Sequence, residues 1–217
     1  MTQATVVLDV DGTLVDSNYH HAVCWARAFG SVGVTVPVWR IHRAIGMGGD
    51  KLVGEVAGDD VEREHGDDVR DRWEREYDEV IDEVVLLPGA KELLAALSER
   101  GLDVALASSS IPKHAERAFD LLDAHDLADT ATTSEDAEES KPDPELIEAA
   151  LDRVGGGPAC VVGDSVWDVQ AARRAGVPAY GVLTGGTSRA ELEEAGAVAV
   201  YRDAADLLEH LDECVPS

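Results

Sequence analysis

Two aspartates, Asp9 and Asp11, carry the clearest chemical potential in this sequence, within the segment Asp9-Val10-Asp11-Gly12-Thr13. They follow the apolar run Val6-Val7-Leu8, which predicts a buried strand. Alternate residues of a strand point to the same face, so the two carboxylates would converge. A buried charge is costly unless it is paired, metal-bound or neutralised. The segment therefore indicates either a metal-binding reactive centre or a polar strand end followed by an ordinary Asp-Gly turn.

Further polar groups follow later apolar runs. Ser108-Ser109-Ser110 comes after one predicted strand, Asp164 and Asp168 come after another, and Lys141-Pro142 precedes a predicted helix. Carboxylates hold Mg²⁺, and hydroxyl and ammonium groups stabilise charged phosphoryl oxygens, so this set suits phosphoryl transfer. Each group also has an ordinary interpretation. The serines could cap the next helix, Lys141 could be an exposed lysine, and Asp164 could be part of a turn.

The elements that would position these residues alternate between strand and helix, which predicts an α/β fold with a doubly wound parallel sheet. Ligands bind at the carboxyl ends of the strands in such sheets. The expected strands are 5–10, 103–107, 130–132, 159–163, 179–183 and 197–200. The expected helices of this part are 90–100, 112–122, 144–154, 166–175, 188–195 and 203–213.

Residues 16–85 contain no convincing strand and predict a purely helical insertion. The expected helices there are 17–32, 38–45, 50–57 and 61–84. We therefore expect an α/β core made of residues 1–15 and 86–217, with residues 16–85 forming an α-helical cap.

The charge balance of the chain is unusual. Its 217 residues include 44 acidic and 18 basic side chains, for a formal net charge of -26. Such a field repels nucleic acid and anionic membranes, so we expect neither as a partner. It also destabilises the folded state unless salt screens it. We interpret the composition as that of a protein from a halophilic host, the alternative being an acidic protein that works at ordinary salt.

Three widely spaced cysteines, Cys24, Cys160 and Cys214, are typical of a reducing cytosol. The first residues show no signal peptide, and no apolar stretch of ~18 residues is present. We therefore expect a cytoplasmic protein. The sequence leaves its assembly open between monomer and homodimer.

Taken in order, four motifs resemble those of the haloacid dehalogenase superfamily. They are Asp9-x-Asp11-Gly-Thr13, Ser108, Lys141-Pro142 and Gly163-Asp164-Ser165-x-x-Asp168. The helical insertion after the first motif is similar to the cap of the phosphoglycolate phosphatase and β-phosphoglucomutase branch. Asp16-Ser17 and Pro88-Gly89, which frame the insertion, also resemble that branch.

The resemblance implies a role for each motif residue. Asp9 would be the nucleophile that forms an aspartyl-phosphate, and Asp11 would be the general acid and then the general base. Thr13 would orient this loop. Asp9, Asp11 (through its main-chain carbonyl), Asp164 and Asp168 would form or support the Mg²⁺ site.

The phosphate-binding groups are expected on other motifs. Ser108 and Ser109 would bind the phosphoryl group, and Lys141 would hold both that group and Asp9. Two carboxylates this close repel each other, so the metal and Lys141 would keep Asp9 ionised.

The resemblance favours a Mg²⁺-dependent phosphatase acting on a small phosphorylated metabolite, a phosphoglycolate-like or sugar-phosphate-like monoester. True dehalogenases generally lack the second aspartate. A β-phosphoglucomutase-like mutase is the alternative, but mutases typically carry Glu-Asp at the fourth motif and basic residues in the cap near Ile45 and Gly49. A non-catalytic binding protein of the same fold is a second alternative, and it would be expected to lack Asp9, Asp11 or Lys141.

Substrate choice in this branch comes from the cap, which closes over the site. His21, Arg43 and Lys51 are the cap residues that we expect to contact substrate. The adjacent His20 and His21 also have an ordinary interpretation as a pair at a helix surface or interface.

Overall fold

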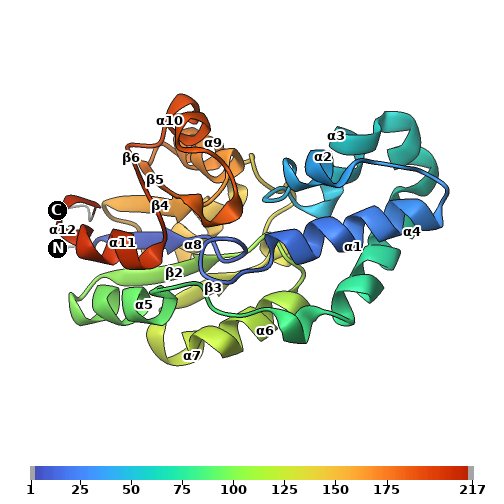
Figure 1. The fold of residues 1–217 in the computed structure, drawn as a ribbon. Helices are drawn as coiled ribbons and strands as arrows, with labels where there is room; N and C mark the ends of the chain where they lie inside the picture. Colours follow the sequence, from blue (N-terminus) through green and yellow to red (C-terminus); the bar gives the residue numbers. More distant parts are fainter. Residues whose placement is uncertain (1–2, 215–217) are drawn as a thin grey trace.

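The computed structural model describes residues 3–214, and within them six strands form one parallel sheet (Figure 1). Their order is β3-β2-β1-β4-β5-β6, so β1 lies in the middle of the sheet. The strands are β1 (Thr5–Leu8), β2 (Asp103–Ala107), β3 (Thr130–Thr132), β4 (Ala159–Gly163), β5 (Ala179–Val182) and β6 (Ala199–Tyr201). The predicted α/β class with a parallel sheet is confirmed, and each predicted strand is present to within two residues at its ends.

Helices cover both faces of the sheet because alternate side chains of its strands are apolar on both sides. Val6 and Leu8 pack in one cluster, and Val7 packs in another. The first cluster includes α5 (Ala90–Glu99), α6 (Pro112–Leu122), α7 (Ala124–Leu127), α11 (Ala204–Glu209) and α12 (Leu211–Cys214). The second includes α8 (Glu145–Arg153), α9 (Val166–Ala175) and α10 (Arg189–Ala195). The sheet is therefore buried on both faces, as parallel sheets require.

The remaining helices form a helical region at one end of the molecule, opposite the chain termini (Figure 1). They are α1 (Asn18–Ser31), α2 (Val38–His42), α3 (Gly49–Ala57) and α4 (Asp59–Asp78), followed by a short 3₁₀ turn, Ile81–Glu83. Trp25, Phe29 and Trp73 are buried between these helices. The region therefore has an apolar interior of its own that is continuous with one face of the core.

The longest helix differs from the prediction at both ends. It begins at Asp59 rather than at residue 61, because Gly58 adopts a φ of 91° that ends α3 and allows the next helix to start at once. It ends at Asp78 rather than at residue 84. The segment after α4 must return to the core beside residues 14–16, where the chain first leaves the core for the helical region. There Asp16 N donates to Val85 O at 2.9 Å, and Leu87 N donates to Leu14 O at 2.9 Å.

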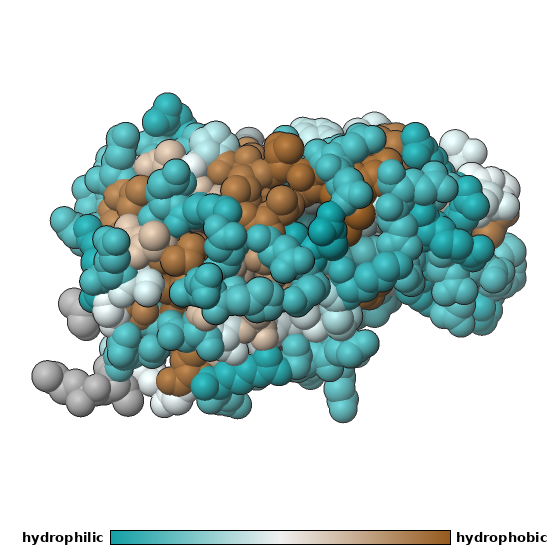
Figure 2. Space-filling view, turned by 90° about the horizontal axis from the view of Figure 1, so that it is seen from below, coloured by the Kyte–Doolittle hydropathy of each residue, from teal (hydrophilic) through white to brown (hydrophobic). Residues whose placement is uncertain are grey.

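The surface reflects the composition. Hydrophilic residues cover most of the face shown in Figure 2, including the helical region at its right end, and an apolar patch lies nearer the middle. Within residues 3–214, we find no helix that is both long enough and apolar enough to cross a membrane.

Candidate active site

Three buried carboxylates meet beyond the ends of β1 and β4. Asp9 follows β1, Asp164 follows β4, and Asp168 lies in the first turn of α9. One oxygen of each lies within 4.8 Å of the others, and the exposed fractions of the three residues are 6%, 2% and 1%. The sheet order explains the meeting, because β1 and β4 are neighbours and point in the same direction. The predicted cluster of Asp9, Asp164 and Asp168 is thus present.

Lys141 neutralises part of this cluster. Its side chain is buried, and Nζ lies 2.5 Å from Asp9 Oδ1 and 2.7 Å from Asp168 Oδ1. Nζ also donates to the main-chain oxygen of Ala107 at 3.3 Å. Two carboxylates and a main-chain oxygen therefore surround the ammonium group, which makes Lys141 a fixed positive charge beside Asp9.

One ammonium group does not balance three buried carboxylates, and the pKa values reflect the excess of negative charge. Burial raises the pKa of Asp9 to about 7, and the attraction of Lys141 only partly opposes this effect. Burial, and then the repulsion of Asp9, raise the pKa of Asp164 well above its usual value. Burial lowers the pKa of Lys141, but the carboxylates of Asp168 and Asp9 outweigh it and raise that pKa.

The remaining oxygens of the cluster accept hydrogen bonds from neutral side-chain and main-chain groups. Thr13 Oγ1 lies 2.9 Å from Asp9 Oδ2 and 3.1 Å from Asp164 Oδ1, and its single proton can serve only one of them. Asn18 Nδ2, at the start of α1, donates to Asp164 Oδ2 at 2.8 Å. Asp168 Oδ2 accepts from Ser165 N at 3.1 Å, in a capping box that begins α9. Thr13 therefore lies between Asp9 and Asp164, and Asn18, which also contacts the cluster, was not among the predicted site residues.

These residues fit a divalent cation. The cluster presents only oxygen donors, the ligands that Mg²⁺ prefers. The negative charge of its three carboxylates exceeds the positive charge of the one ammonium group. The raised pKa values of Asp9 and Asp164 indicate that a further positive charge would be favourable here.

Asp11 lines the same cavity as Asp9, but its carboxylate has hydrogen-bond partners of its own. Ser17 Oγ donates to Asp11 Oδ1 at 2.7 Å, and Ser110 Oγ donates to Asp11 Oδ2 at 2.9 Å. His21 Nε2 lies 3.3 Å from Oδ1, and Ser108 Oγ donates to Oδ2 at 3.3 Å. Burial raises the pKa of Asp11, but the bonds from His21, Ser17 and Ser110 together hold it below its usual range. The two aspartates of the first motif thus experience opposite environments.

Gly12, which directly follows Asp11, allows the turn that separates the surroundings of Asp9 from those of Asp11. Gly12 has a φ of 80°, and a Cβ there would lie 2.3 Å from Asn18 Nδ2. Thr184 Oγ1 donates to the main-chain oxygen of Gly12 at 2.5 Å, which fixes the turn from the direction of β5. A side chain at this position would displace Asn18 and with it the support of Asp164.

The predicted serines reach the site in different ways. Ser108 is fully buried and contacts Asp11, as described above. Ser109 Oγ lies 3.4 Å from the main-chain oxygen of Gly46 in the helical region, and it lines the cavity that contains Asp9 and Asp11. Ser110, which donates a hydrogen bond to Asp11, was not among the predicted site residues although it directly follows Ser109 in the sequence.

His21 is brought to the site from α1. Its ring stacks on Tyr77 with centroids 3.9 Å apart and an interplanar angle of 17°, and it lies 5.6 Å from the ring of Trp73. His21 thus also lies at a helix interface, the setting of its alternative interpretation, because α1 and α4 pack together here. His21 lines the cavity that contains Asp9 and Asp11, and it contacts Asp11.

Arg43 and Lys51 are used differently from the prediction. The guanidinium group of Arg43 pairs with Glu191 on α10. Lys51 Nζ donates to the main-chain oxygen of Ser140 at 2.7 Å and pairs with Glu139 at 3.0 Å. Both cations link the helical region to the core. Their predicted contact with substrate therefore has no support in this geometry.

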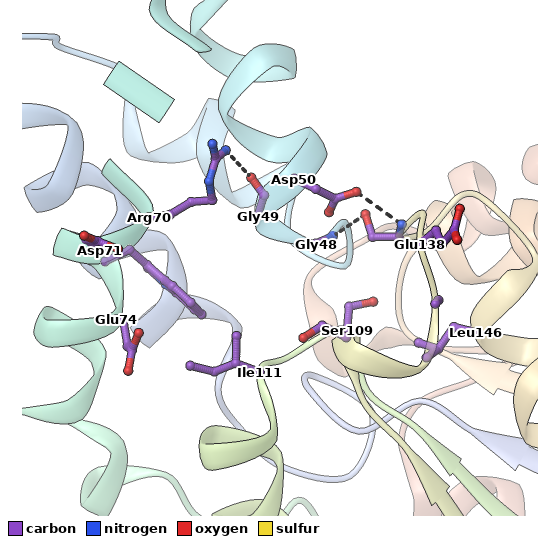
Figure 3. A pocket seen from close by; sticks show the side chains of 14 residues that line it. Gly48, Gly49, Asp50, Arg70, Asp71, Glu74, Ser109, Ile111, Glu138 and Leu146 are labelled. Atoms are coloured by element: carbon purple, nitrogen blue, oxygen red, sulfur yellow. Dashed lines mark hydrogen bonds between the residues drawn. The ribbon is translucent and has the colours of Figure 1, made fainter. Parts of the chain in front are cut away.

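Two adjoining cavities open above the cluster. We call the first the catalytic cavity; it is lined by Asp9, Asp11, His21, Trp25, Ile45, Gly46, Met47, Gly48, Gly49, Trp73, Ser109 and Ser110. We call the second the outer cavity; it has a volume of about 290 Å³ and lies between α4 and the core (Figure 3). The two share Gly48, Gly49, Trp73 and Ser109. A ligand can therefore extend from one into the other.

Comparisons with known proteins agree with this geometry. A family model described as haloacid dehalogenase-like hydrolase matches residues 3–176. A crystal structure of a hydrolase from Pseudomonas syringae superimposes with a TM-score of 0.91 at 34% identity, covering 97% of this chain and 99% of that one.

Two curated relatives have names that state an activity. Validoxylamine A 7'-phosphate phosphatase of Streptomyces hygroscopicus subsp. limoneus is 28% identical over 192 residues, which are 82% of this chain and 84% of the relative. Phosphoglycolate phosphatase of Vibrio vulnificus is 29% identical over 201 residues, which are 85% of this chain and 87% of the relative. Both relatives are phosphatases by name.

Proposed function

Because this chain belongs to the haloacid dehalogenase-like hydrolases, we propose that it is a Mg²⁺-dependent phosphatase that hydrolyses a small phosphomonoester through an aspartyl-phosphate. The observation that carries the proposal is the difference in surroundings between two aspartates of one loop. Asp9 is held between Lys141 and Thr13 beside Asp164, and Asp11 is held by a separate set of donors across the same cavity. This difference supports a role for Asp9 as the attacking carboxylate and for Asp11 as the group that moves a proton.

In the first step, an oxygen of Asp9 forms a bond to phosphorus while the bond from phosphorus to the leaving alkoxide breaks. Lys141 keeps Asp9 in place and offsets the negative charge that the phosphoryl group brings. Asp11 gives its proton to the leaving oxygen, which departs as an alcohol. The negative phosphoryl group opposes ionisation of Asp11, so its binding raises the low pKa of this side chain and favours the acid form.

In the second step, Asp11 accepts a proton from water, and the resulting hydroxide attacks phosphorus and releases Asp9 and inorganic phosphate. His21 and Ser17 hold the Asp11 carboxylate in both steps. Ser109, just after β2, lines the cavity, where its hydroxyl faces the space that the phosphoryl oxygens would occupy. Ser108 is buried beside it, with its main-chain amide donating to Thr132 O and its hydroxyl to Asp11, so its proposed contact with the phosphoryl group would need a rearrangement of that hydroxyl. Asp9, Asp164 and the Asp11 carbonyl, with Asp168 beside them, would hold Mg²⁺, which neutralises charge between Asp9 and the phosphoryl group when bound.

A phosphomutase is less favoured by the charges of the outer cavity. A mutase forms a bisphosphate intermediate, and the second phosphoryl group of that intermediate requires a cation at the far end of the site. Arg70 lines the outer cavity, but its guanidinium group is already paired with Glu62 and Asp67, each at 2.9 Å. A non-catalytic role is disfavoured by the retention of Asp9, Asp11 and Lys141 in one buried arrangement.

The setting of the enzyme forms part of the proposal. We keep the division into a core of residues 1–15 and 86–217 and a cap of residues 16–85. The three cysteines are unpaired and buried, which suits a cytoplasmic protein. The surplus of acidic residues suits a host with high intracellular salt.

The direct test is phosphate release from a panel of phosphomonoesters at molar KCl, with Mg²⁺ or with EDTA. We expect release only with Mg²⁺, and we expect Asp9→Asn to lower kcat/KM at least about a thousandfold. Glu99→Gln is the matched control, because Glu99 is an exposed acid on α5 in the core. Unchanged release by Asp9→Asn, or full release in EDTA, would contradict the proposal.

A further inference from the structure

The outer cavity lies where the leaving group of a bound ester would extend. A phosphoryl group at Asp9 occupies the catalytic cavity, and the rest of the ester can pass into the outer cavity through the shared boundary of Gly48, Trp73 and Ser109. The volume of about 290 Å³ is at the lower end of the roughly 300–1,000 Å³ typical of small-molecule sites. The space therefore suits one ring-sized group.

The charges around this space are almost all negative. Figure 3 shows Arg70, Asp71 and Glu74 of α4 on one side of the cavity and the core residues on the other. Its acidic lining residues are Asp50, Asp71, Glu74 and Glu138. Among the lining residues, all of them within 3–214, Arg70 is the single cation.

Arg70 is not available to an anionic ligand. Its Nη2 lies 2.9 Å from Glu62 Oε1 and 2.9 Å from Asp67 Oδ1, and its Nη1 donates to the main-chain oxygen of Gly49 at 3.1 Å. Two cations that contact lining residues are likewise engaged. Lys51 Nζ donates to the main-chain oxygen of Ser140 at 2.7 Å and pairs with Glu139 at 3.0 Å, and Lys113 Nζ lies 2.5 Å from Asp78 Oδ2 and 3.4 Å from Glu74 Oε1. A carboxylate placed in the outer cavity would thus find acidic neighbours whose cations are already paired.

The remaining surface of the cavity is apolar on some walls and hydroxyl-lined on others. Trp73 stacks on Trp25 with centroids 4.9 Å apart and an interplanar angle of 12°, so its indole is a rigid wall. Ile111 and Leu146 extend the apolar lining, and Ser109, Ser134 and Ser140 contribute hydroxyls. Aromatic walls pack against the C–H faces of a ring, and serine hydroxyls and carboxylates accept hydrogen bonds from its hydroxyl groups.

We propose that the substrate is the phosphate ester of an uncharged, polyhydroxylated ring alcohol, a sugar or a cyclitol, and that Glu74 and its acidic neighbours discriminate against carboxylate-bearing esters. The inference rests on the proposed phosphatase function and narrows its substrate class. An ester with a carboxylate in the leaving group, phosphoglycolate included, would bring like charges together without a compensating cation.

The test compares two esters that differ only in this charge. Glucose 1-phosphate and glucuronic acid 1-phosphate share one ring, with a hydroxymethyl group in the first where the second has a carboxylate. We expect kcat/KM to favour glucose 1-phosphate at least about tenfold at molar KCl, where the field of the whole protein is screened. A ratio near one, or a preference for glucuronic acid 1-phosphate, would overturn the inference.

Variants separate the cavity from the overall charge. Glu74→Gln removes an acidic group from the lining and one of the two ion pairs of Lys113. The ratio of kcat/KM for glucose 1-phosphate to that for glucuronic acid 1-phosphate is therefore expected to fall at least about threefold. Glu99→Gln removes the same charge from α5 outside the lining and should leave the ratio unchanged. An equal fall in both variants would assign the discrimination to net charge and overturn the role of the cavity.

Failure of the function and failure of the inference are distinguishable. Methyl phosphate, a phosphomonoester whose leaving group is too small to need the outer cavity, reports on phosphatase activity alone. If wild-type protein with Mg²⁺ does not hydrolyse it, the proposed function fails. In that case, calorimetric titration of Asp9→Asn with the two sugar esters measures the preference of the outer cavity for the uncharged ring. Equal or tighter binding of glucuronic acid 1-phosphate would overturn the inference.

Discussion

Replacing Lys141 with methionine should destabilise the protein strongly, because it removes the only ammonium group in contact with the buried acidic cluster of the described chain. The side chain is 1% exposed, and its Nζ pairs with Asp9 at 2.5 Å and Asp168 at 2.7 Å. Methionine keeps most of the aliphatic volume, so the loss is mainly electrostatic. Removing one partner of a buried ion pair costs about 3–5 kcal/mol, because the other charge is left uncompensated.

The expected effect can be measured as a melting temperature. For a domain of this size, 1 kcal/mol corresponds to about 2–4 °C, so Lys141→Met should lower Tm by about 6–20 °C at neutral pH in EDTA. Lys91→Met is the matched control. Lys91 pairs with Asp123 on the surface, and such pairs contribute about 0–1 kcal/mol.

The loss of stability caused by Lys141→Met should also grow as pH rises. In the folded wild type, the pKa of Asp9 is raised from 3.8 to about 7. An acid with a raised pKa stabilises the fold below its unfolded pKa, and that stability is lost as pH rises through the folded value. Without Lys141 the pKa of Asp9 rises further, so the variant should lose more between pH 5 and pH 8 than wild type does. Thermal unfolding of both proteins across this range measures the difference.

Two results would refute this reasoning. One is a Tm within about 2 °C of wild type, less than the change expected for 1 kcal/mol, which would mean that Lys141 does not compensate the cluster. The other is a large deficit that stays constant with pH, which would indicate a loss of packing rather than of charge. Addition of Mg²⁺ should recover part of the deficit, because the cation supplies positive charge to the same carboxylates.

Three further predictions concern the support of the site and its surroundings. Asn18→Ala removes the donor to Asp164 Oδ2 and should weaken Mg²⁺ binding about 10–100-fold, as measured by calorimetry; unchanged affinity would argue against the cation site. His21→Phe keeps the stack on Tyr77 but removes a donor that lowers the pKa of Asp11, so the acidic limb of the pH profile of kcat/KM should move to higher pH; an unmoved limb would separate His21 from proton transfer. Tm should rise from low salt to molar KCl, because 44 acidic residues face 18 basic ones; a flat or falling curve would remove the halophilic interpretation.

The sequence predicted the sheet and the carboxylate cluster well, for a physical reason. Buried parallel strands are short apolar runs, and polar groups just after them meet at one edge of the sheet. Asp9 and Asp164 could be placed at one edge because each directly follows a predicted strand of the same parallel sheet, whereas the adjacency of β1 and β4 comes from the structure. The same reasoning does not apply to the helical region, where contacts depend on how helices pack.

The residues that were missed come from such packing. Asn18 and Ser17 lie at the start of α1, and the turn at Gly12 decides that they face Asp164 and Asp11. A sequence signal was present for them, since polar residues directly follow the first motif. Arg43 was misjudged for a different reason. With acidic residues so abundant, a cation of the helical region finds an acidic partner on the core, and the sequence does not show which cation stays available.

The central claim is that Asp9 carries the phosphoryl group between substrate and water. Rapid acid quenching of enzyme turning over a sugar phosphate, followed by mass spectrometry of its peptides, measures this directly. We predict the added mass of one phosphoryl group on the peptide that contains Asp9 in wild type, and none in Asp9→Asn. Full phosphate release with the group on a serine peptide, or with the modification retained in Asp9→Asn, would contradict the account.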